Sequence, residues 1–316
     1  MMGFNMDKMK KIVFAGLDFS GKTSIILTLN EEFSKLQNLK PTMGIETRTD
    51  NILGMKVVQW DIGGQEQFRK QYVKDKSHFE NTDLLCYVID VTDYSPERIQ
   101  ESIEYFKQIL GVFAYFNFNP KIIVFLHKID PDVQFQEEIK QNCGHIHRTI
   151  SSIEEIQARK FEVDFFRTSI YNKWSLLKAF SHGITSLTTK TRTLTKIFED
   201  FAKKNECKAI TLKDDNLLTI SEFYTDQIYE KIIEKFALSL IFAYKDLKKS
   251  TLKDFSKMLL EMDEEYMLIQ RVNIIDVDFY VIAISSSKDV QKLVKKSLLE
   301  FLTNIESIVS NFFLSK

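Results

Sequence analysis

Short apolar runs alternate with longer amphipathic segments through the first half of the chain. The runs are rich in branched and aromatic side chains and are bounded by polar turns, which is typical of strands. Most are apolar at consecutive positions, as expected for strands buried on both faces of a parallel sheet. Strands are expected at residues 11–15, 57–60, 84–89, 122–126 and 161–166. Because helix-length segments separate them, the pattern predicts a doubly wound, mainly parallel α/β domain.

Gly54 lies between two further strand-like runs, residues 47–53 and 57–62. A glycine between two such runs is typical of a tight hairpin turn. The hairpin is expected to add one antiparallel strand at the edge of the sheet.

The second half of the chain has a different pattern, since residues 184–316 contain neither glycine nor proline. We expect a helix, a strand pair, a long helix, a second hairpin and a final helix. Their residues are 191–204, 209–212, 217–221, 227–249, 267–273, 278–284 and about 290–313. This order predicts a smaller α/β sandwich with helices packed on an antiparallel sheet. Two domains are therefore expected, residues 1–185 and 186–316.

The composition is that of a folded protein, with 44% hydrophobic residues and 43 Lys+Arg against 44 Asp+Glu. Since there is no basic excess, nucleic acid is not an expected partner. No apolar run reaches the roughly 18 residues of a membrane span, and Asp7 stands where a signal peptide would be apolar. These features favour a cytoplasmic protein. Cys86, Cys143 and Cys207 are too widely spaced for a disulfide framework or a zinc site.

Residues 16–23 read Gly-Leu-Asp-Phe-Ser-Gly-Lys-Thr, directly after a predicted strand and before a predicted helix. This spacing is typical of a phosphate-binding loop, whose backbone amides surround a β-phosphate at a helix N-terminus. Lys22 is placed to bridge the β- and γ-phosphates, and the Thr23 hydroxyl is placed to bind magnesium. The expected nucleotide-binding residues are Gly16, Asp18, Phe19, Ser20, Gly21, Lys22, Thr23 and Ser24.

A second group of candidate residues ends the predicted hairpin. Asp61 is expected to hold magnesium through a water molecule, and Gly64 to offer its amide to the γ-phosphate. Gln65 is placed to orient the attacking water, the role of such a glutamine in Ras-like and Gα proteins. Thr42, in a loop that precedes the hairpin, is expected to complete the magnesium shell.

A candidate base-recognition segment, His-Lys-Ile-Asp at residues 127–130, follows an apolar strand at the sheet edge where ligands bind in such folds. It is similar to the guanine-specificity motif Asn-Lys-x-Asp, with His127 in the Asn position. Asp130 is expected to accept hydrogen bonds from guanine N1 and its exocyclic amine, while the Lys128 stem covers the base. The remaining guanine loop fits Ser169 and Ile170, with the Ile170 amide facing the base oxygen.

The first domain resembles a small GTPase over residues 10 to about 185. Residues 16–23, 41–44 and 60–65 resemble the corresponding motifs of Arf-type GTPases in sequence. The segments that resemble Rag-type GTPases are residues 127–130, 166–170 and 173–175. The second domain decides between the two, because its order of elements is similar to the roadblock/longin-like domain that follows the GTPase domain in Rag proteins. With Gln65 present, the chain resembles the Rag A/B branch.

The resemblance implies a guanine-nucleotide switch that binds GTP or GDP with magnesium and hydrolyses GTP slowly unless an activating protein assists. It also implies effector proteins, and a homodimer or a heterodimer with a related GTPase through the C-terminal domain. The sequence around Gly3 lacks the Ser or Thr of a myristoylation signal, so no intrinsic membrane anchor is expected. Any recruitment to a membrane would then depend on partners.

No residue is assigned as an arginine finger. Arg48, Arg69 and Arg98 lie near the motifs in sequence, and each is expected to be a solvated surface charge.

Two other classes of function remain open. The first is a nucleotide-binding scaffold subunit of a GTPase dimer that does not hydrolyse GTP, and the presence of Gln65 and Thr42 counts against it. The second is a P-loop ATPase or small-molecule kinase, which Asp130 opposes because its carboxylate matches the donors of guanine.

Overall fold

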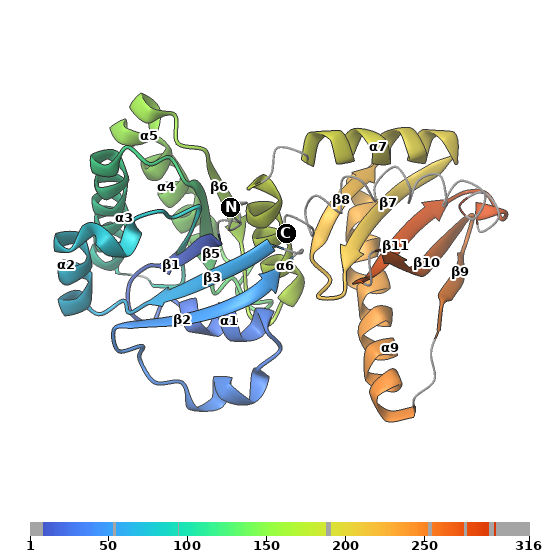
Figure 1. Cartoon of the computed structure of the whole chain (residues 1–316), viewed down its shortest axis with the longest axis horizontal. Helices are drawn as coiled ribbons and strands as arrows, with labels where there is room; N and C mark the ends of the chain where they lie inside the picture. Colours follow the sequence, from blue (N-terminus) through green and yellow to red (C-terminus); the bar gives the residue numbers. More distant parts are fainter. Residues whose placement is uncertain are drawn as a thin grey trace, which may run out of the picture. The chain divides into compact units, whose positions relative to one another are not determined.

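The computed structural model describes residues 9–52, 55–93, 95–187, 191–251, 255–274, 277–290 and 294. The chain divides into two compact units, residues 1–187 and 188–316 (Figure 1).

The first unit contains a six-stranded sheet in the order β2-β3-β1-β4-β5-β6. All neighbouring strands are parallel except β2 and β3, which form the predicted antiparallel hairpin at one edge. The strands are β1 (Lys10–Ala15), β2 (Ile45–Ile52), β3 (Met55–Ile62), β4 (Leu84–Asp90), β5 (Lys121–His127) and β6 (Val163–Arg167). The predicted doubly wound, mainly parallel sheet is therefore confirmed. The turn glycine of the hairpin, Gly54, lies outside the described residues.

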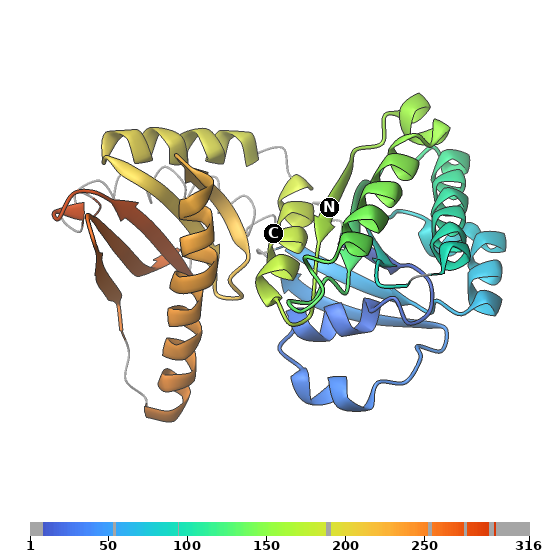
Figure 2. The same ribbon diagram turned by 180° about the vertical axis from the view of Figure 1, so that it is seen from behind.

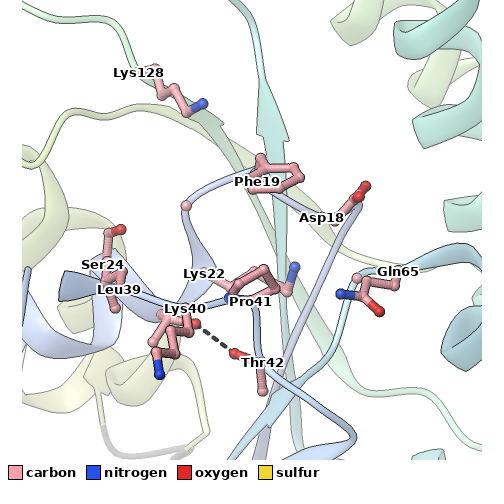
Figure 3. A pocket seen from close by; sticks show the side chains of 13 residues that line it. Asp18, Phe19, Lys22, Ser24, Leu39, Lys40, Pro41, Thr42, Gln65 and Lys128 are labelled. Atoms are coloured by element: carbon pink, nitrogen blue, oxygen red, sulfur yellow. Dashed lines mark hydrogen bonds between the residues drawn. The ribbon is translucent and has the colours of Figure 1, made fainter.

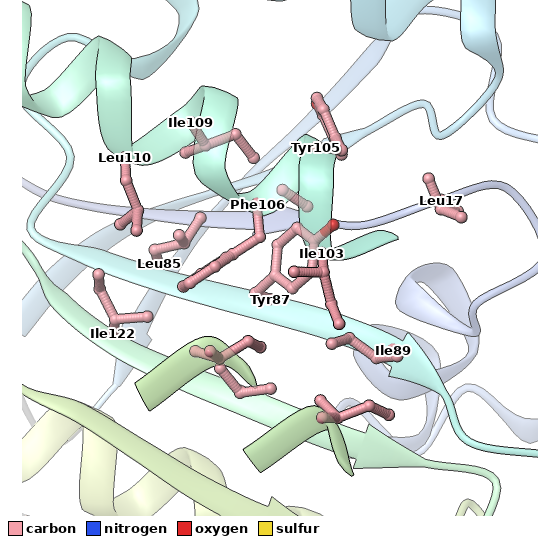
Figure 4. Packing of buried hydrophobic residues seen from close by; sticks show 14 of the residues in the cluster. Leu17, Leu85, Tyr87, Ile89, Ile103, Tyr105, Phe106, Ile109, Leu110 and Ile122 are labelled. Carbon is pink, nitrogen blue, oxygen red and sulfur yellow. The ribbon is translucent and has the colours of Figure 1, made fainter. Parts of the chain in front are cut away.

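Helices cover this sheet on both faces. Successive side chains of a strand point to opposite sides, so each central strand packs against helices of both layers. On one face, Phe14 of β1 contacts Phe180 of α6, with ring centroids 6.1 Å apart. On the other, Tyr87 of β4 packs on Phe106 of α3 at 4.8 Å (Figure 4). The helices are α1 (Lys22–Leu29), α2 (Glu66–Lys74), α3 (Pro96–Phe116), α4 (Glu137–Ser151), α5 (Glu154–Arg159) and α6 (Lys173–Ser186), with 3-10 helices at Phe33–Asn38 and Lys76–Phe79.

The second unit is a five-stranded antiparallel sheet in the order β8-β7-β11-β10-β9. The strands are β7 (Cys207–Asp214), β8 (Thr219–Tyr224), β9 (Lys257–Met262), β10 (Glu265–Ile274) and β11 (Val277–Ser285). Strand β7 contacts both α7 (Thr191–Lys204) and α8 (Gln227–Ile232) of the second unit (Figures 1 and 2). Nearly all residues of β7 are buried. The smaller sandwich predicted for the second half is thus present.

Two elements of the second unit differ from the sequence prediction. Strand β9 was not predicted, and the long helix contains a π turn, Ile233–Ala237, between α8 and α9 (Leu238–Thr251). Each depends on packing against neighbouring elements, which local sequence pattern does not report. Most of the predicted final helix lies outside the described residues, but Val290 and Val294 are helical and fully buried.

Among the described residues, no helix has the length and apolar character needed to cross a bilayer.

Candidate functional site

A cavity of about 270 Å³ lies at the carboxyl ends of the first unit's strands (Figure 3). The chain leaves β1 for α1 at this edge, and β1 lies between β3 and β4 in the sheet. This point, where strand order reverses, is the usual ligand crevice of an open α/β sheet. The lining residues are Asp18, Phe19, Gly21, Lys22, Thr23, Ser24, Leu39, Lys40, Pro41, Thr42, Gly64, Gln65 and Lys128.

The loop between β1 and α1 has the conformation that its glycines permit. Gly21 is the N-cap of α1 and has a φ of 100°, in the left-handed region that favours glycine. Lys22 begins the helix, and its buried ammonium donates hydrogen bonds to the carbonyl oxygens of Gly16 (3.2 Å) and Leu17 (2.7 Å). Burial lowers the pKa of Lys22 to about 8, against the opposing effect of the Asp61 and Asp18 carboxylates. A phosphate at this helix N-terminus would favour the charged lysine.

Three oxygen-bearing side chains converge beside Lys22. The Thr23 hydroxyl donates to Asp61 Oδ2 at 2.6 Å, and Thr42 Oγ1 lies 3.0 Å from Thr23 Oγ1 and 3.3 Å from Asp61 Oδ2. The other Asp61 oxygen, Oδ1, is buried and has no hydrogen-bond partner among the described residues. Burial raises the pKa of Asp61, while the bond from Thr23 and the charge of Lys22 oppose this rise. Hard oxygen ligands with a spare buried carboxylate oxygen fit Mg²⁺.

The loop that carries Thr42 is folded against the end of β3. The Gly63 amide donates to the Gly44 carbonyl at 2.8 Å, so Thr42 is held close to Thr23 and Asp61. The candidate metal ligands from three separate segments are therefore close together.

Gly64 packs directly on the phosphate loop. Its carbonyl accepts a hydrogen bond from the Asp18 amide at 3.0 Å, and a Cβ atom added to Gly64 would lie 2.2 Å from that nitrogen. Only glycine allows this approach. Gln65 follows as the N-cap of α2, lines the cavity, and accepts a hydrogen bond at Oε1 from Gln67 Nε2 at 3.2 Å.

The base-recognition segment, residues 127–130, follows β5, and Lys128 is its one residue that lines the cavity. The Lys128 ammonium forms an ion pair with Asp90 Oδ2 at 2.6 Å. Asp130 Oδ1 accepts a hydrogen bond from the Ser169 hydroxyl, which joins the two predicted base-binding loops. Ile170, next to Ser169, is half-buried.

His127 connects these loops to the phosphate loop. Its ring is buried, Nδ1 lies 3.0 Å from Thr168 Oγ1, and its other edge faces Gly21. Burial lowers the pKa of His127 to about 4, with a smaller contribution from the charge of Lys128. The side chain is therefore neutral near pH 7. In this structure the histidine contacts the phosphate loop from the Asn position of the motif.

The structure does not place all the predicted residues on the cavity wall. Ser20 has a buried hydroxyl that no described residue hydrogen-bonds, and it lines a second cavity of about 180 Å³ beside α3. The predicted residues that do not line the main cavity are Gly16, Ser20, Asp61, His127, Asp130, Ser169 and Ile170.

The prediction that three arginines are solvated surface charges is wrong for Arg69 and holds only in part for Arg48 and Arg98, whose side chains are 33% and 31% exposed. Arg69 is only 7% exposed, and its Nε donates to the Gly64 carbonyl at 2.8 Å. Arg98 donates to the Asp18 carbonyl at 2.9 Å and also to the Asp18 carboxylate. Arg48 forms an ion pair with Glu32 at 2.7 Å. Each guanidinium has oxygen acceptors that only the folded chain brings near, which is why sequence proximity was misleading.

Sequence reasoning also missed several residues at the cavity. Asp90 ends strand β4, pairs with Lys128 and lines the second cavity, so its place at a strand's carboxyl end was an available signal. The missed residues that line the main cavity, all shortly before Thr42 in sequence, are Leu39, Lys40 and Pro41.

Comparison with known proteins agrees with this geometry. Residues 11–238 match the family model described as "Gtr1/RagA G protein conserved region". GTP-binding protein gtr1 of Schizosaccharomyces pombe is 27% identical over 223 residues, 69% of each chain. ADP-ribosylation factor-like protein 3 of Chlamydomonas reinhardtii is 37% identical over 92 residues, which are 29% of this chain and 48% of that protein.

A solved structure, the Arl6 BBS3 small GTPase of Trypanosoma brucei with bound GppNp, superposes with a TM-score of 0.43 at 17% identity. It covers 57% of this chain and 98% of its own. The family match spans more than half of the chain and confirms the Rag-type resemblance read from the sequence. The chain therefore belongs to the Gtr1/RagA G protein family, whose members are GTPases.

Proposed function

We propose that this protein is a magnesium-dependent guanine-nucleotide switch that binds GTP and GDP and hydrolyses GTP slowly. The observation that carries the proposal is the convergence of Thr23, Thr42 and Asp61 beside the buried ammonium of Lys22. A cation with adjacent hard oxygen ligands at a helix N-terminus suits a nucleoside triphosphate.

The phosphate end of the site would act through Lys22, Gly64 and Gln65. Lys22 holds negative charge on the β- and γ-phosphates, and the Gly64 amide binds the γ-phosphate. Gln65 positions the attacking water in line with the bond that breaks. Thr23 and Thr42 would ligate magnesium directly, with Asp61 acting through water. The ion, when bound, neutralises charge on the β- and γ-oxygens.

No arginine of the described residues extends into the cavity as an arginine finger, because Arg69 and Arg98 are already held by Gly64 and Asp18. Intrinsic turnover is then expected on the order of 10⁻³ s⁻¹ or below, and a GTPase-activating protein would raise it.

Guanine selectivity would come from Asp130, with Lys128 covering the base and the Ser169–Ile170 loop facing the base oxygen. The hydrogen bond from Ser169 to Asp130 supports this arrangement because it orients the carboxylate, and both carboxylate oxygens keep lone pairs for the two donors of guanine. Asp18, Phe19, Ser20 and Ser24 would contribute loop contacts to the nucleotide.

The second unit would be a roadblock-like dimerisation domain, giving a homodimer or a heterodimer with a related GTPase. An available sheet edge supports this. Strand β9 is at the end of the sheet order, and Leu259 on it is 47% exposed. Effector proteins would bind in the GTP state. The proposed location is the cytoplasm, with membrane recruitment through partners.

The direct test is single-turnover hydrolysis of radiolabelled GTP by the full chain and by Gln65→Leu. The variant should bind GTP with an affinity within about threefold of the unmodified protein, while phosphate release falls at least about tenfold. Gln71→Leu, an exposed position on the same helix, is the matched control and should retain turnover. Binding of GTP without measurable hydrolysis by the unmodified chain would instead favour the scaffold function.

A further inference from the structure

Two buried or partly buried arginines of the first unit lie beside the nucleotide cavity, and the proposed hydrolysis assigns them no role. Arg69 comes from α2, directly after Gln65, and Arg98 comes from the start of α3. Both guanidinium groups bind the carboxylate of Glu101, one turn further along α3. We name Asp18, Arg69, Arg98 and Glu101 the arginine–glutamate network.

At one end of the network, Arg69 holds the peptide that precedes Gln65. Its Nε donates to the Gly64 carbonyl at 2.8 Å, and its guanidinium lies 5.3 Å from the Tyr105 ring centroid. A peptide group is planar, so fixing the Gly64 carbonyl also fixes the Gln65 amide that shares its plane. The Arg69 amide donates to the Gln65 carbonyl at 3.0 Å as well. The Arg69 side chain therefore holds the peptide that precedes Gln65, while its backbone amide makes the ordinary first-turn bond of α2 to the Gln65 carbonyl.

At the other end, Arg98 holds the phosphate loop. It donates to the carbonyl of Asp18 at 2.9 Å and to the Asp18 carboxylate, and a second nitrogen lies 3.2 Å from Glu101. The Asp18 amide donates to the same Gly64 carbonyl that Arg69 binds. The contacts thus form a closed ring from Gly64 through the network and back to Gly64.

Glu101 is the link on which this ring depends. Its two carboxylate oxygens are divided between the two arginines, Oε1 to Arg69 and Oε2 to Arg98. Without the negative charge, two neighbouring guanidinium groups would repel one another, and Arg69 would lose the partner that aims its Nε at Gly64.

We infer that Arg69 and Glu101 are positioning residues for GTP hydrolysis. Glu101 anchors Arg69 to helix α3, and Arg69 in turn holds Gln65 in a fixed position relative to the phosphate loop. The inference rests on the proposed function. It assigns Arg69 and Glu101 to the placement of Gln65, while the affinity for nucleotide is set by the phosphate loop, which includes Asp18, and by Asp130. Loss of Glu101 should therefore lower the rate of hydrolysis without an equal loss of nucleotide binding.

The experiment compares the unmodified chain with Glu101→Gln, which keeps the shape of the side chain and removes its charge. Single-turnover hydrolysis of GTP should fall about tenfold, the effect of losing one charge-assisted hydrogen bond. The dissociation constant of a fluorescent GDP analogue should change less than threefold. Glu104→Gln is the control, because Glu104 is exposed on the same helix and pairs only with Lys107, at 3.8 Å, among the described contacts. It should hydrolyse GTP within twofold of the unmodified chain.

A double-mutant cycle distinguishes positioning from general destabilisation. Arg69→Lys cannot hold the Gly64 carbonyl and Glu101 at once, so it should lower the rate on its own. If the two residues act together, Arg69→Lys with Glu101→Gln should be no slower than the worse single variant. A merely structural role would instead lower the thermal midpoint and weaken GDP binding in proportion.

Turnover of Glu101→Gln equal to that of the unmodified chain would overturn the inference while leaving the proposed function intact. So would a fall in GDP affinity as large as the fall in rate. If the unmodified chain binds GTP and releases no phosphate, the proposed function fails, and the positioning role fails with it.

Discussion

The imidazole of His127 packs against the backbone of Gly21 in the phosphate loop. A Cβ atom added to Gly21 would lie 2.5 Å from His127 Cδ2, closer than carbon atoms approach in folded proteins. The ring edge that bears Nδ1 is 3.0 Å from Thr168 Oγ1. One buried neutral side chain therefore connects the phosphate loop to the strand end that precedes the proposed guanine loop.

This contact predicts that Gly21→Ala destabilises the first unit. The substitution adds a clash with His127 to a backbone φ of 100°, so the free energy of unfolding should fall by at least about 2 kcal/mol. Gly111→Ala is a matched control, since that glycine is in α3 and a Cβ there meets no atom within 4 Å. The control should gain about 0.5–1 kcal/mol of stability from helix propensity. Urea unfolding of the two variants measures both effects, and equal stabilities would contradict the packing.

A pH dependence follows from the same histidine. Its pKa is about 4 in the folded chain, below its usual value, so the unfolded chain binds more protons between about pH 4 and 6.5. The stabilising effect is lost as the pH falls, and stability should rise by about 3 kcal/mol from pH 4 to 6.5. His127→Asn, which restores the residue of the motif and cannot titrate, should flatten this dependence. An unchanged slope in that variant would show that other groups cause it.

Asp214 in the second unit should give the opposite slope. Burial raises its pKa to about 7, although the Leu218 amide donates to its carboxylate at 2.7 Å. The folded chain then binds the extra proton between about pH 4 and 7, so this group lowers stability as the pH rises through that range. Asp214→Asn keeps an oxygen acceptor for Leu218 and should raise the thermal midpoint at pH 8 but not at pH 4. If the variant is destabilised at both pH values, the charge of Asp214 is not the cause of the loss of stability at high pH.

Base selectivity is predicted to depend on Asp130. In Asp130→Asn, an NH2 group takes the place of one carboxylate oxygen. Because this group donates and cannot accept a hydrogen bond from guanine N1, GTP affinity should fall at least about 100-fold. Competition between GTP and ATP for the site measures the ratio directly. Asp132→Asn, two residues later and exposed, is the control that should retain the preference for GTP. If Asp130→Asn keeps the preference for GTP over ATP, Asp130 does not recognise the base.

Much of the first unit could be predicted because its signals are local. An apolar run such as Ile122–Leu126 forms a buried strand wherever helices cover both faces, and the structure extends it to Lys121–His127. The phosphate loop is similarly readable, since its glycines and Lys22 act through their own backbone and the following helix.

The features that were missed depend on contacts between distant segments. Arg69 and Arg98 belong to exposed-looking helical turns, and only the fold brings Glu101 within reach of Arg69 and Asp18 within reach of Arg98. Strand β9, Lys257–Met262, lacks β-branched residues and forms because β10 pairs with it. Propensity alone does not predict such a strand.

The proposed function requires the cavity to bind guanine nucleotide, and the most direct test is to identify the ligand that copurifies with the chain. The protein is denatured, and the released small molecules are separated by anion-exchange chromatography against nucleotide standards. GDP or GTP at close to one molecule per chain is the predicted result, whereas an adenine nucleotide at that ratio would contradict guanine binding.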